Sequence, residues 1–421
     1  MNALVVRFVL ALVRLFYPDR RVRGEAPREG AAVVVANHMN GLVDPVLLSA
    51  VLGRPLPFLA KSTLFQMPVI GWFVRIFRGI PVYRAGEADP SKNAETFAAA
   101  RQILAEGGWM ALFPEGVSHS NPSLMPLKTG AARIVLGGPP GVRIVPVGLT
   151  YEDKTVFRSA VSVSIGPPLE VDRFRRHGGE HADDVAALTE AIGAALHQEL
   201  LEAEDHEIWR GFRAVASWMA APREPAEQTE ARALALSRGW RALPQARREA
   251  LERAARGFAA RLASVGVRDP WLLDAGPPSA GQVLRAALPL VLTAPVALLG
   301  ALLGWIPYRA VGVVVARLKP EEDLIATSKV LGGMLFLSVW WVAQAVALGL
   351  LYNPWLGLAA LLIAPAAGLV ALRWDERLSR RRRLGRAWWL LWTARGVADA
   401  VRRERAALAD QVRAALGAVE A

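Results

Sequence analysis

The chain has 421 residues, 53% of them hydrophobic, a formal net charge of +12 and no cysteine. Without cysteine it has no disulfide, no thiolate metal ligand and no cysteine nucleophile. The positive charge predicts an anionic partner. Anionic membrane lipids or a phosphorylated ligand are favoured. No nucleic acid is expected, because the sequence contains no recognised nucleic-acid-binding motif.

Residues 1–18 are predicted to form an interfacial membrane helix. It is apolar apart from Arg7 and Arg14, which share one helical face. It is too short to cross roughly 30 Å of hydrocarbon but suits a helix lying among lipid headgroups. The two arginines and the lack of a small-residue cleavage site argue against a signal peptide. A first helix packed on the core is the alternative.

Residues 19–220 are predicted to form the catalytic domain, with an α/β fold. Apolar runs there alternate with helical patterns. The predicted strands are residues 31–36, 79–83, 109–113, 143–149 and 160–165, and the predicted helices are residues 45–52, 91–106 and 130–136. Residues 221–280 predict a helical linker region in which Pro225 and Pro244 interrupt helices.

Residues 281–372 are predicted to form membrane-embedded helices. Three apolar runs, at residues 286–305, 330–351 and 355–372, are near the length of a membrane span. Trp340 and Trp374 are among the expected interface anchors. Basic residues flank the last two runs on both sides, which places both flanks of this hairpin in the cytoplasm. Pro289 and Pro295 suggest that the first run is re-entrant or interfacial. Residues 373–421 predict a basic amphipathic C-terminal helix.

Chemistry is expected first at the sequence Asn37-His38-Met39-Asn40-Gly41-Leu42-Val43-Asp44-Pro45, directly after a predicted strand. A carboxylate across a short turn can hold one imidazole nitrogen while the other faces substrate, which makes a general base without a protein nucleophile. By itself, Asp44-Pro45 would fit an ordinary helix start, since Asp is a favoured N-cap and Pro a favoured first residue.

Three further blocks strengthen the catalytic interpretation. Residues 79–84 end a strand at Arg84, whose planar guanidinium suits phosphate. Residues 113–120 place Glu115 and Gly116 in a sharp turn where glycine permits close approach to a ligand. Lys128 precedes a helix start that can receive an anion. Residues 144–148 predict a pocket wall.

These blocks, in this order, resemble the glycerophospholipid acyltransferase family, which includes glycerol-3-phosphate and lysophosphatidate acyltransferases. The resemblance covers about residues 1–170. Two departures resemble the fungal-type glycerol-3-phosphate/dihydroxyacetone-phosphate branch. Five residues, Met39 to Val43, separate His38 from Asp44 where the family usually has four, and Ser118 stands where it usually has arginine. The resemblance implies a mixed central sheet flanked by helices.

The resemblance implies that His38 and Asp44 are catalytic, with His38 as the base and Asp44 orienting it. The residues implied to bind substrate are Glu115, Gly116, Arg84, Lys61, Lys128, Asn37 and Ser118. It implies no cofactor and no metal. The expected partners are an acyl thioester donor, acyl-CoA or acyl-carrier protein, and an acceptor, either a glycerol phosphate or a lysophospholipid. The expected location is a bacterial-type cytoplasmic membrane, with the catalytic domain on the cytoplasmic face.

Two rival functions fit parts of the pattern. A lipid hydrolase could use Ser118 or Ser120 beside His119, although no Gly-x-Ser-x-Gly motif occurs. A non-catalytic membrane scaffold would also use the basic, apolar segments, but it has no need of His38, Asp44, Glu115 and Gly116 together. The remaining histidines, including His177 and His181, show no metal-ligand spacing.

Overall fold

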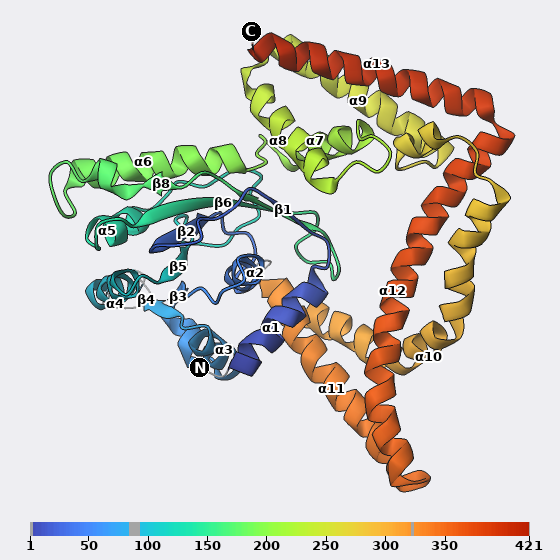
Figure 1. The fold of residues 1–421 in the computed structure, drawn as a ribbon, viewed down its shortest axis with the longest axis horizontal. Helices are drawn as coiled ribbons and strands as arrows, with labels where there is room; N and C mark the ends of the chain where they lie inside the picture. Colours follow the sequence, from blue (N-terminus) through green and yellow to red (C-terminus); the bar gives the residue numbers. More distant parts are fainter. Residues whose placement is uncertain (1–2, 84–92, 321–323, 421) are drawn as a thin grey trace. The chain divides into compact units, whose positions relative to one another are not determined.

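The computed structural model describes residues 3–83, 93–320 and 324–420 (Figure 1). The chain forms two compact units. The first comprises residues 1–209 with residues 320–330, and the second comprises residues 210–319 with residues 331–421.

The first unit is built on a six-stranded mixed sheet, as the family resemblance predicts. The strand order is β1-β7-β6-β2-β5, and β8 also pairs with β6. β2 runs parallel to β5 and β6, whereas β7 and β8 are antiparallel to β6. The strands are β1 (Arg20–Arg23), β2 (Ala32–Ala36), β5 (Trp109–Leu112), β6 (Arg143–Tyr151), β7 (Val161–Ile165) and β8 (Leu169–Glu170).

Both faces of the sheet are covered, which explains why its central strands read as continuous apolar runs. Alternate residues of β2 enter different cores: Val34 packs with one cluster and Val33 with the other. The Val34 side is covered by α1 (Ala3–Phe16), α2 (Val43–Val51) and α3 (Pro68–Ile76). The Val33 side is covered by α4 (Asn93–Ala105), α5 (Gly130–Leu136) and α6 (Ala182–Glu199).

A second, two-stranded sheet extends the parallel arrangement. β3 (Leu59–Lys61) pairs in parallel with β4 (Ile80–Val82), and Phe58 forms a parallel bridge with Ala111 of β5. The carboxyl ends of β2, β5 and β3 therefore meet at one edge. Because the chain leaves these strands at Asn37, Phe113 and Ser62, the predicted motifs gather at that edge.

Among the described residues, the second unit is helical. Its helices include α8 (Ala226–Ala242), α9 (Gln245–Val265), α10 (Ala280–Leu318), α12 (Pro354–Thr393) and α13 (Arg395–Glu420). α7 (His206–Trp218) crosses from the first unit into the second, and α11 (Ile325–Leu351) begins in the first and continues in the second. Pro225 and Pro244 precede α8 and α9, in agreement with their predicted role as helix breaks.

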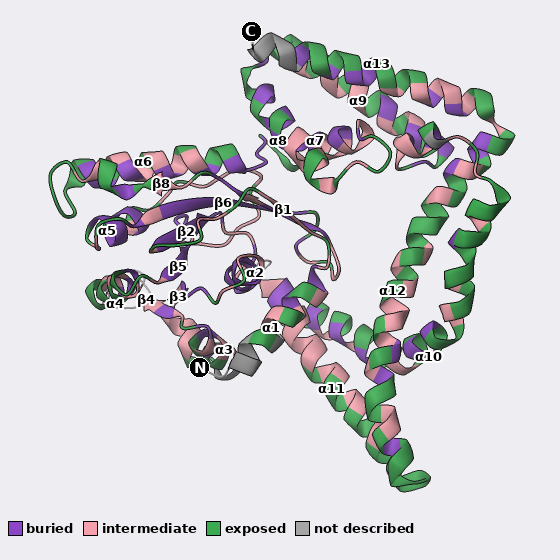
Figure 2. Cartoon of the chain, viewed as in Figure 1, coloured by how far each residue is buried: buried purple, intermediate pink, exposed green. Residues whose placement is uncertain are grey.

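Among the described residues, three helices, α10, α11 and α12, are long and apolar enough to cross a membrane. Their apolar residues are largely exposed, in contrast to the buried strands (Figure 2). α10 is one continuous helix of 39 residues despite Pro289 and Pro295. α12 continues for 40 residues, so the predicted boundary at residues 372–373 falls inside a helix.

Trp340 and Trp374 hold helices together through their indole groups. Trp340 and Gln344 of α11 both donate to the Leu303 carbonyl of α10, at 2.7 and 3.2 Å. Pro307, four residues further along α10, has no N–H to donate to that carbonyl. Trp374 of α12 donates to the Leu290 carbonyl of α10. Both indole N–H groups thus bond to a neighbouring helix.

Candidate active site

His38 and Asp44 lie side by side at the carboxyl edge of β2. His38 Nδ1 is 2.8 Å from Asp44 Oδ2. Because a carboxylate accepts, Nδ1 carries the proton, and the Nε2 lone pair is left to act as the base. The His38 ring stacks on Phe113 at 4.2 Å between centroids. No described residue bonds to Nε2, and the His38 side chain is 17% exposed.

Asp44 is fully buried, and its charge is supported by several donors. Oδ2 also accepts from the backbone N–H groups of Met39 and Asn40, at 2.9 and 2.8 Å, and Oδ1 accepts from the Tyr151 hydroxyl at 2.5 Å. Asp44 lies in the first turn of α2, whose N-cap is Leu42. It is therefore not the N-cap of α2, and the helix dipole adds to the stabilisation of its charge.

The Tyr151 hydroxyl stays protonated in this setting. Burial raises the pKa of Tyr151 well above its ordinary value, and the neighbouring Asp44 charge raises the pKa further. Burial likewise raises the pKa of Tyr17, whose hydroxyl accepts from the Asn40 amide at 2.8 Å. Both phenols therefore remain hydrogen-bond donors across the working pH range of a histidine base.

Glu115 joins the His38 turn to the turn after β5. Its Oε1 accepts the His38 backbone N–H at 2.7 Å, and its Oε2 accepts from Met125 N–H and from His119 Nε2. The tautomer of His119 is fixed, because its Nδ1 accepts the Asn121 N–H. Glu115 is only 2% exposed. The resemblance implies that Glu115 helps to position the acceptor, and in the structure its carboxylate lies between two backbone turns.

The structure brings Gly116 and Lys128 together. Gly116 has a φ of 72°, and an added Cβ would lie 2.8 Å from Lys128 Nζ. The positive φ favours glycine in this turn, and a larger residue would also displace the Lys128 side chain. Lys128 is exposed, and Ser118, where the family usually has arginine, is half-buried in the same turn.

The remaining residues predicted to bind substrate are Asn37, Lys61 and Arg84. Asn37 Nδ2 donates to the Leu149 carbonyl and its Oδ1 accepts the Leu149 N–H, so its amide extends the β2–β6 pairing. Lys61 ends β3 at the same edge as His38. Arg84 lies outside the described residues.

A small cavity of about 20 Å³ is lined in part by Asn37, His119, Leu200 and Glu202. Its volume suits roughly one water molecule. Leu200 directly follows α6, so the C-terminal end of α6 lies near this edge of the sheet.

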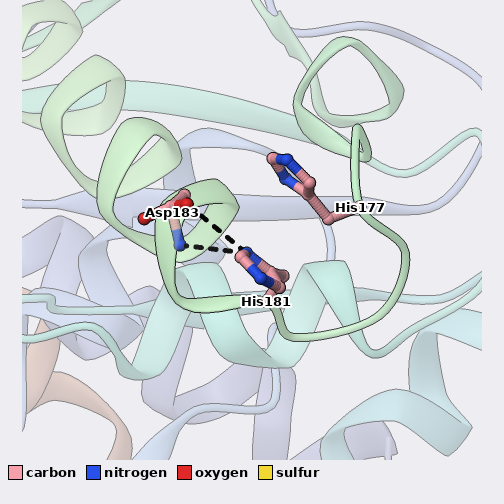
Figure 3. Close-up of side chains that lie close together, drawn as sticks. All are labelled: His177, His181 and Asp183. Carbon is pink, nitrogen blue, oxygen red and sulfur yellow. Dashed lines mark hydrogen bonds and ion pairs between the residues drawn. The ribbon is translucent and has the colours of Figure 1, made fainter.

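One group of described side chains could hold a metal ion: His177, His181 and Asp183 (Figure 3). Sequence spacing did not predict it. The three groups are exposed and lie at the N-terminal end of α6. Because α6 has 18 residues, it is about 27 Å long, and Leu200 lies at its other end. His177 Nδ1 bonds to Asp184, and His181 Nδ1 accepts the Asp183 N–H. These bonds fasten the loop to α6, and the group is remote from His38.

Sequence reasoning missed three residues of the site. Tyr151 and Tyr17 support Asp44 and Asn40, and Lys154 bonds to both active-site turns. Tyr151 and Lys154 come just after the predicted strand of residues 143–149, and Tyr17 ends the first apolar segment. Only the position of polar groups at a strand or helix end could have suggested them.

Part of the chain is similar in sequence to known proteins. Residues 19–150 match the sequence profile of the Acyltransferase family. The chain is 33% identical to glycerol-3-phosphate O-acyltransferase 2 of Saccharomyces cerevisiae, over 28% of this chain and 17% of that protein. It is 32% identical to the chloroplastic 1-acyl-sn-glycerol-3-phosphate acyltransferase BAT2 of Brassica napus, over 28% of this chain and 32% of that protein.

Among solved structures, the chain is similar to the 1-acyl-sn-glycerophosphate (LPA) acyltransferase of Thermotoga maritima. The TM-score is 0.34 and the sequence identity 22%, covering 45% of this chain and 76% of that one. The chain thus spans a third or less of the length of the two sequence relatives above.

Proposed function

We propose that this chain, whose residues 19–150 match the Acyltransferase family, is a membrane-bound O-acyltransferase of phospholipid biosynthesis. It transfers a fatty acyl group from an acyl thioester to a hydroxyl of glycerol 3-phosphate or dihydroxyacetone phosphate. The observation that carries the proposal is the His38–Asp44 pair, in which a buried carboxylate lies 2.8 Å from Nδ1 and the His38 side chain is 17% exposed.

The proposed reaction needs only one base. His38 Nε2 removes the proton from the acceptor hydroxyl, and the oxygen attacks the thioester carbonyl. The C–S bond then breaks, and the leaving thiolate takes the proton from the imidazolium. Asp44 stabilises the imidazolium between these two transfers, because it already accepts the Nδ1 proton.

The acceptor phosphate is proposed to bind to cations beside this pair. Lys128 lies against Gly116, in the turn where Ser118 stands in place of the usual arginine. Lys61 ends a strand at the same edge, and Arg84 follows β4 in the sequence. We assign Lys128 the main contact, because its amine lies directly against the turn that the family resemblance links to substrate.

The proposed location is a cytoplasmic membrane with the catalytic unit on the cytoplasmic face. Three long apolar helices support membrane association. The first turns of α11, within residues 320–330, fold with the catalytic unit, so α11 enters the membrane from the side on which that unit lies.

A lysophosphatidate acceptor is the second candidate. It is favoured by the similarity to BAT2, a 1-acyl-sn-glycerol-3-phosphate acyltransferase by name. Glycerol 3-phosphate and lysophosphatidate share a phosphate and a nearby hydroxyl, so the same residues could bind either.

The test is an acceptor panel with the purified full chain in lipid nanodiscs. Glycerol 3-phosphate, dihydroxyacetone phosphate and 1-acylglycerol 3-phosphate are each combined with labelled acyl-CoA or acyl-carrier protein. We expect acylated glycerol 3-phosphate or dihydroxyacetone phosphate, and we expect His38→Ala to lower the rate about 10²–10⁴-fold without unfolding the protein. Fatty acid release without acceptor would indicate a hydrolase, and vesicle binding without transfer would indicate a scaffold. An active His38→Ala variant would remove the proposed base.

A further inference from the structure

The loop between β6 and β7, residues 152–160, contacts both turns of the proposed active site through Lys154. The Lys154 ammonium donates to the Met39 carbonyl at 2.8 Å and to the Ser120 hydroxyl at 2.6 Å. A longer bond of 3.4 Å reaches the His119 carbonyl. Met39 follows the base directly, and Ser120 lies in the turn that Glu115 begins. One cation therefore fastens the two turns to each other.

Lys154 is buried. It is 8% exposed, and three protein oxygens lie within hydrogen-bond distance of its ammonium. Its own carbonyl accepts from the Tyr17 hydroxyl at 2.6 Å and from the Asn40 amide at 3.3 Å. A buried ammonium is costly unless each donor is bonded, so removing it leaves the Met39 carbonyl and the Ser120 hydroxyl to rearrange.

The same loop is fastened to two apolar helices. On one side, Arg158 N–H donates to the Phe16 carbonyl of α1 at 2.7 Å, and the Phe157 ring packs on Phe16. On the other side, Lys329 of α11 donates to the Thr155 carbonyl at 2.6 Å. Ala326, in the first turn of α11, is 1% exposed and belongs to the core beneath α1 and α2. All these contacts lie within the first unit.

We propose that Lys154 is a positioning residue for acyl transfer and that Lys329 couples it to the membrane helix α11. The proposal rests on the proposed function for its catalytic part. Lys154 holds the Met39 and Ser120 turns at the separation at which Asp44 and Glu115 can both bond to the His38 residue. Lys329 fixes the loop from the opposite side, so the entry of α11 into the membrane helps to set the geometry of the base.

The experiment compares Lys154→Met, Lys329→Met and the double variant with the wild type in nanodiscs. Methionine keeps the aliphatic length and removes the ammonium. Lys319→Met is the matched control, because Lys319 is exposed at the end of α10, in the second unit. We measure kcat and KM for the acceptor, and amide hydrogen exchange of the turns at residues 37–44 and 115–125.

For Lys154→Met we expect kcat to fall at least about 10-fold with KM within about 3-fold, because misplacement of a base lowers the rate more than the affinity. Hydrogen exchange should rise in both turns and stay low in β2 and β6, which shows that the sheet remains folded. Lys329→Met should lower kcat less and raise exchange at residues 152–160. The double variant should be no slower than Lys154→Met, since both act through one contact chain. Lys319→Met should match the wild type.

The outcomes separate this proposal from the proposed function. Transfer by the wild type with unchanged kcat and unchanged exchange in Lys154→Met overturns the positioning role alone. Strictly additive rate losses in the double variant overturn the coupling to α11. Absence of transfer by the wild type overturns the proposed function, and hydrogen exchange then still decides whether Lys154 and Lys329 order the two turns.

Discussion

At the scale of single residues, the site depends on a buried charge that is fully compensated. Asp44 accepts from His38, from two backbone N–H groups and from Tyr151. A carboxylate without such donors would be expelled from the interior or neutralised. The pair can therefore hold the His38 ring in one tautomer and still stabilise a positive charge on it.

The first prediction concerns Asp44→Asn. A neutral amide lacks the negative charge that stabilises the imidazolium. Both oxygens of Asp44 accept hydrogen bonds, so the NH₂ group of asparagine would face a donor in place of one of them. We expect kcat to fall by about 100-fold or more, with a lower unfolding temperature because Tyr151 or a backbone N–H loses its acceptor. Steady-state kinetics and thermal unfolding check this result. Asp183→Asn, at an exposed aspartate, is the control and should leave kcat unchanged. Equal effects of both substitutions would contradict a special role for Asp44.

The scale of elements shows why turns after parallel strands carry the chemistry. β2, β5 and β3 end at one edge, so His38, Glu115 and Lys61 meet there although they are far apart in sequence. Glu115 then ties the first two turns through the His38 N–H.

A second prediction follows for the Glu115 turn. Gly116→Ala places a Cβ 2.8 Å from Lys128 Nζ at a φ of 72°, so the turn must distort or Lys128 must move. We expect a rise of about 10-fold or more in KM for the acceptor, because Lys128 is the proposed phosphate ligand. Gly130→Ala is the control, since Gly130 begins α5 with open space around its added Cβ. An unchanged KM in Gly116→Ala would argue against Lys128 as the phosphate ligand.

A third prediction concerns the apolar helices. Trp340 and Gln344 donate to the Leu303 carbonyl, which Pro307 cannot serve within α10. Replacing them by phenylalanine and leucine should lower the unfolding temperature in detergent, with a loss of about 0.6–2 kcal/mol per bond. In a Pro307→Ala background the same replacements should cost less, because the restored N–H serves the carbonyl. Equal costs in both backgrounds would show that these bonds do not compensate for the proline.

At the scale of the whole molecule, the absence of cysteine makes membrane topology directly measurable. Single cysteines can be introduced at Tyr352, in the turn between α11 and α12, and at Ser379, within the basic part of α12. The basic residues around Ser379 should remain in the cytoplasm, whereas the turn at Tyr352 should reach the opposite side.

The fourth prediction is that, in intact cells, a membrane-impermeant maleimide labels Tyr352→Cys and not Ser379→Cys. Permeabilised cells should show both labelled, and the cysteine-free parent should show neither. Labelling of Ser379→Cys in intact cells would place the basic segment outside and contradict the proposed cytoplasmic location. The reagent reports only exposed thiols, and Tyr352 is 73% exposed.

The sequence by itself determined the parts that depend on neighbouring residues. Apolar runs marked β2, β5, β6 and β7, because strands buried on both faces contain few polar residues. His38 and Asp44 could be paired from their spacing, since one turn separates them. The long apolar helices were equally visible, because a membrane span is a local property of composition.

The tertiary structure decided the contacts between distant segments. The bonds of Glu115 to His38, of Tyr151 to Asp44, and of Lys154 to Met39 join residues 77, 107 and 115 positions apart. Nothing in the local pattern marks them, since any polar residue after a strand can face solvent. Strand order and register bring them to one edge. A charge buried at this edge needs hydrogen-bond partners. Glu115 and Lys154 find theirs in the turn after β2 and the turn after β5, and so both lie between these turns.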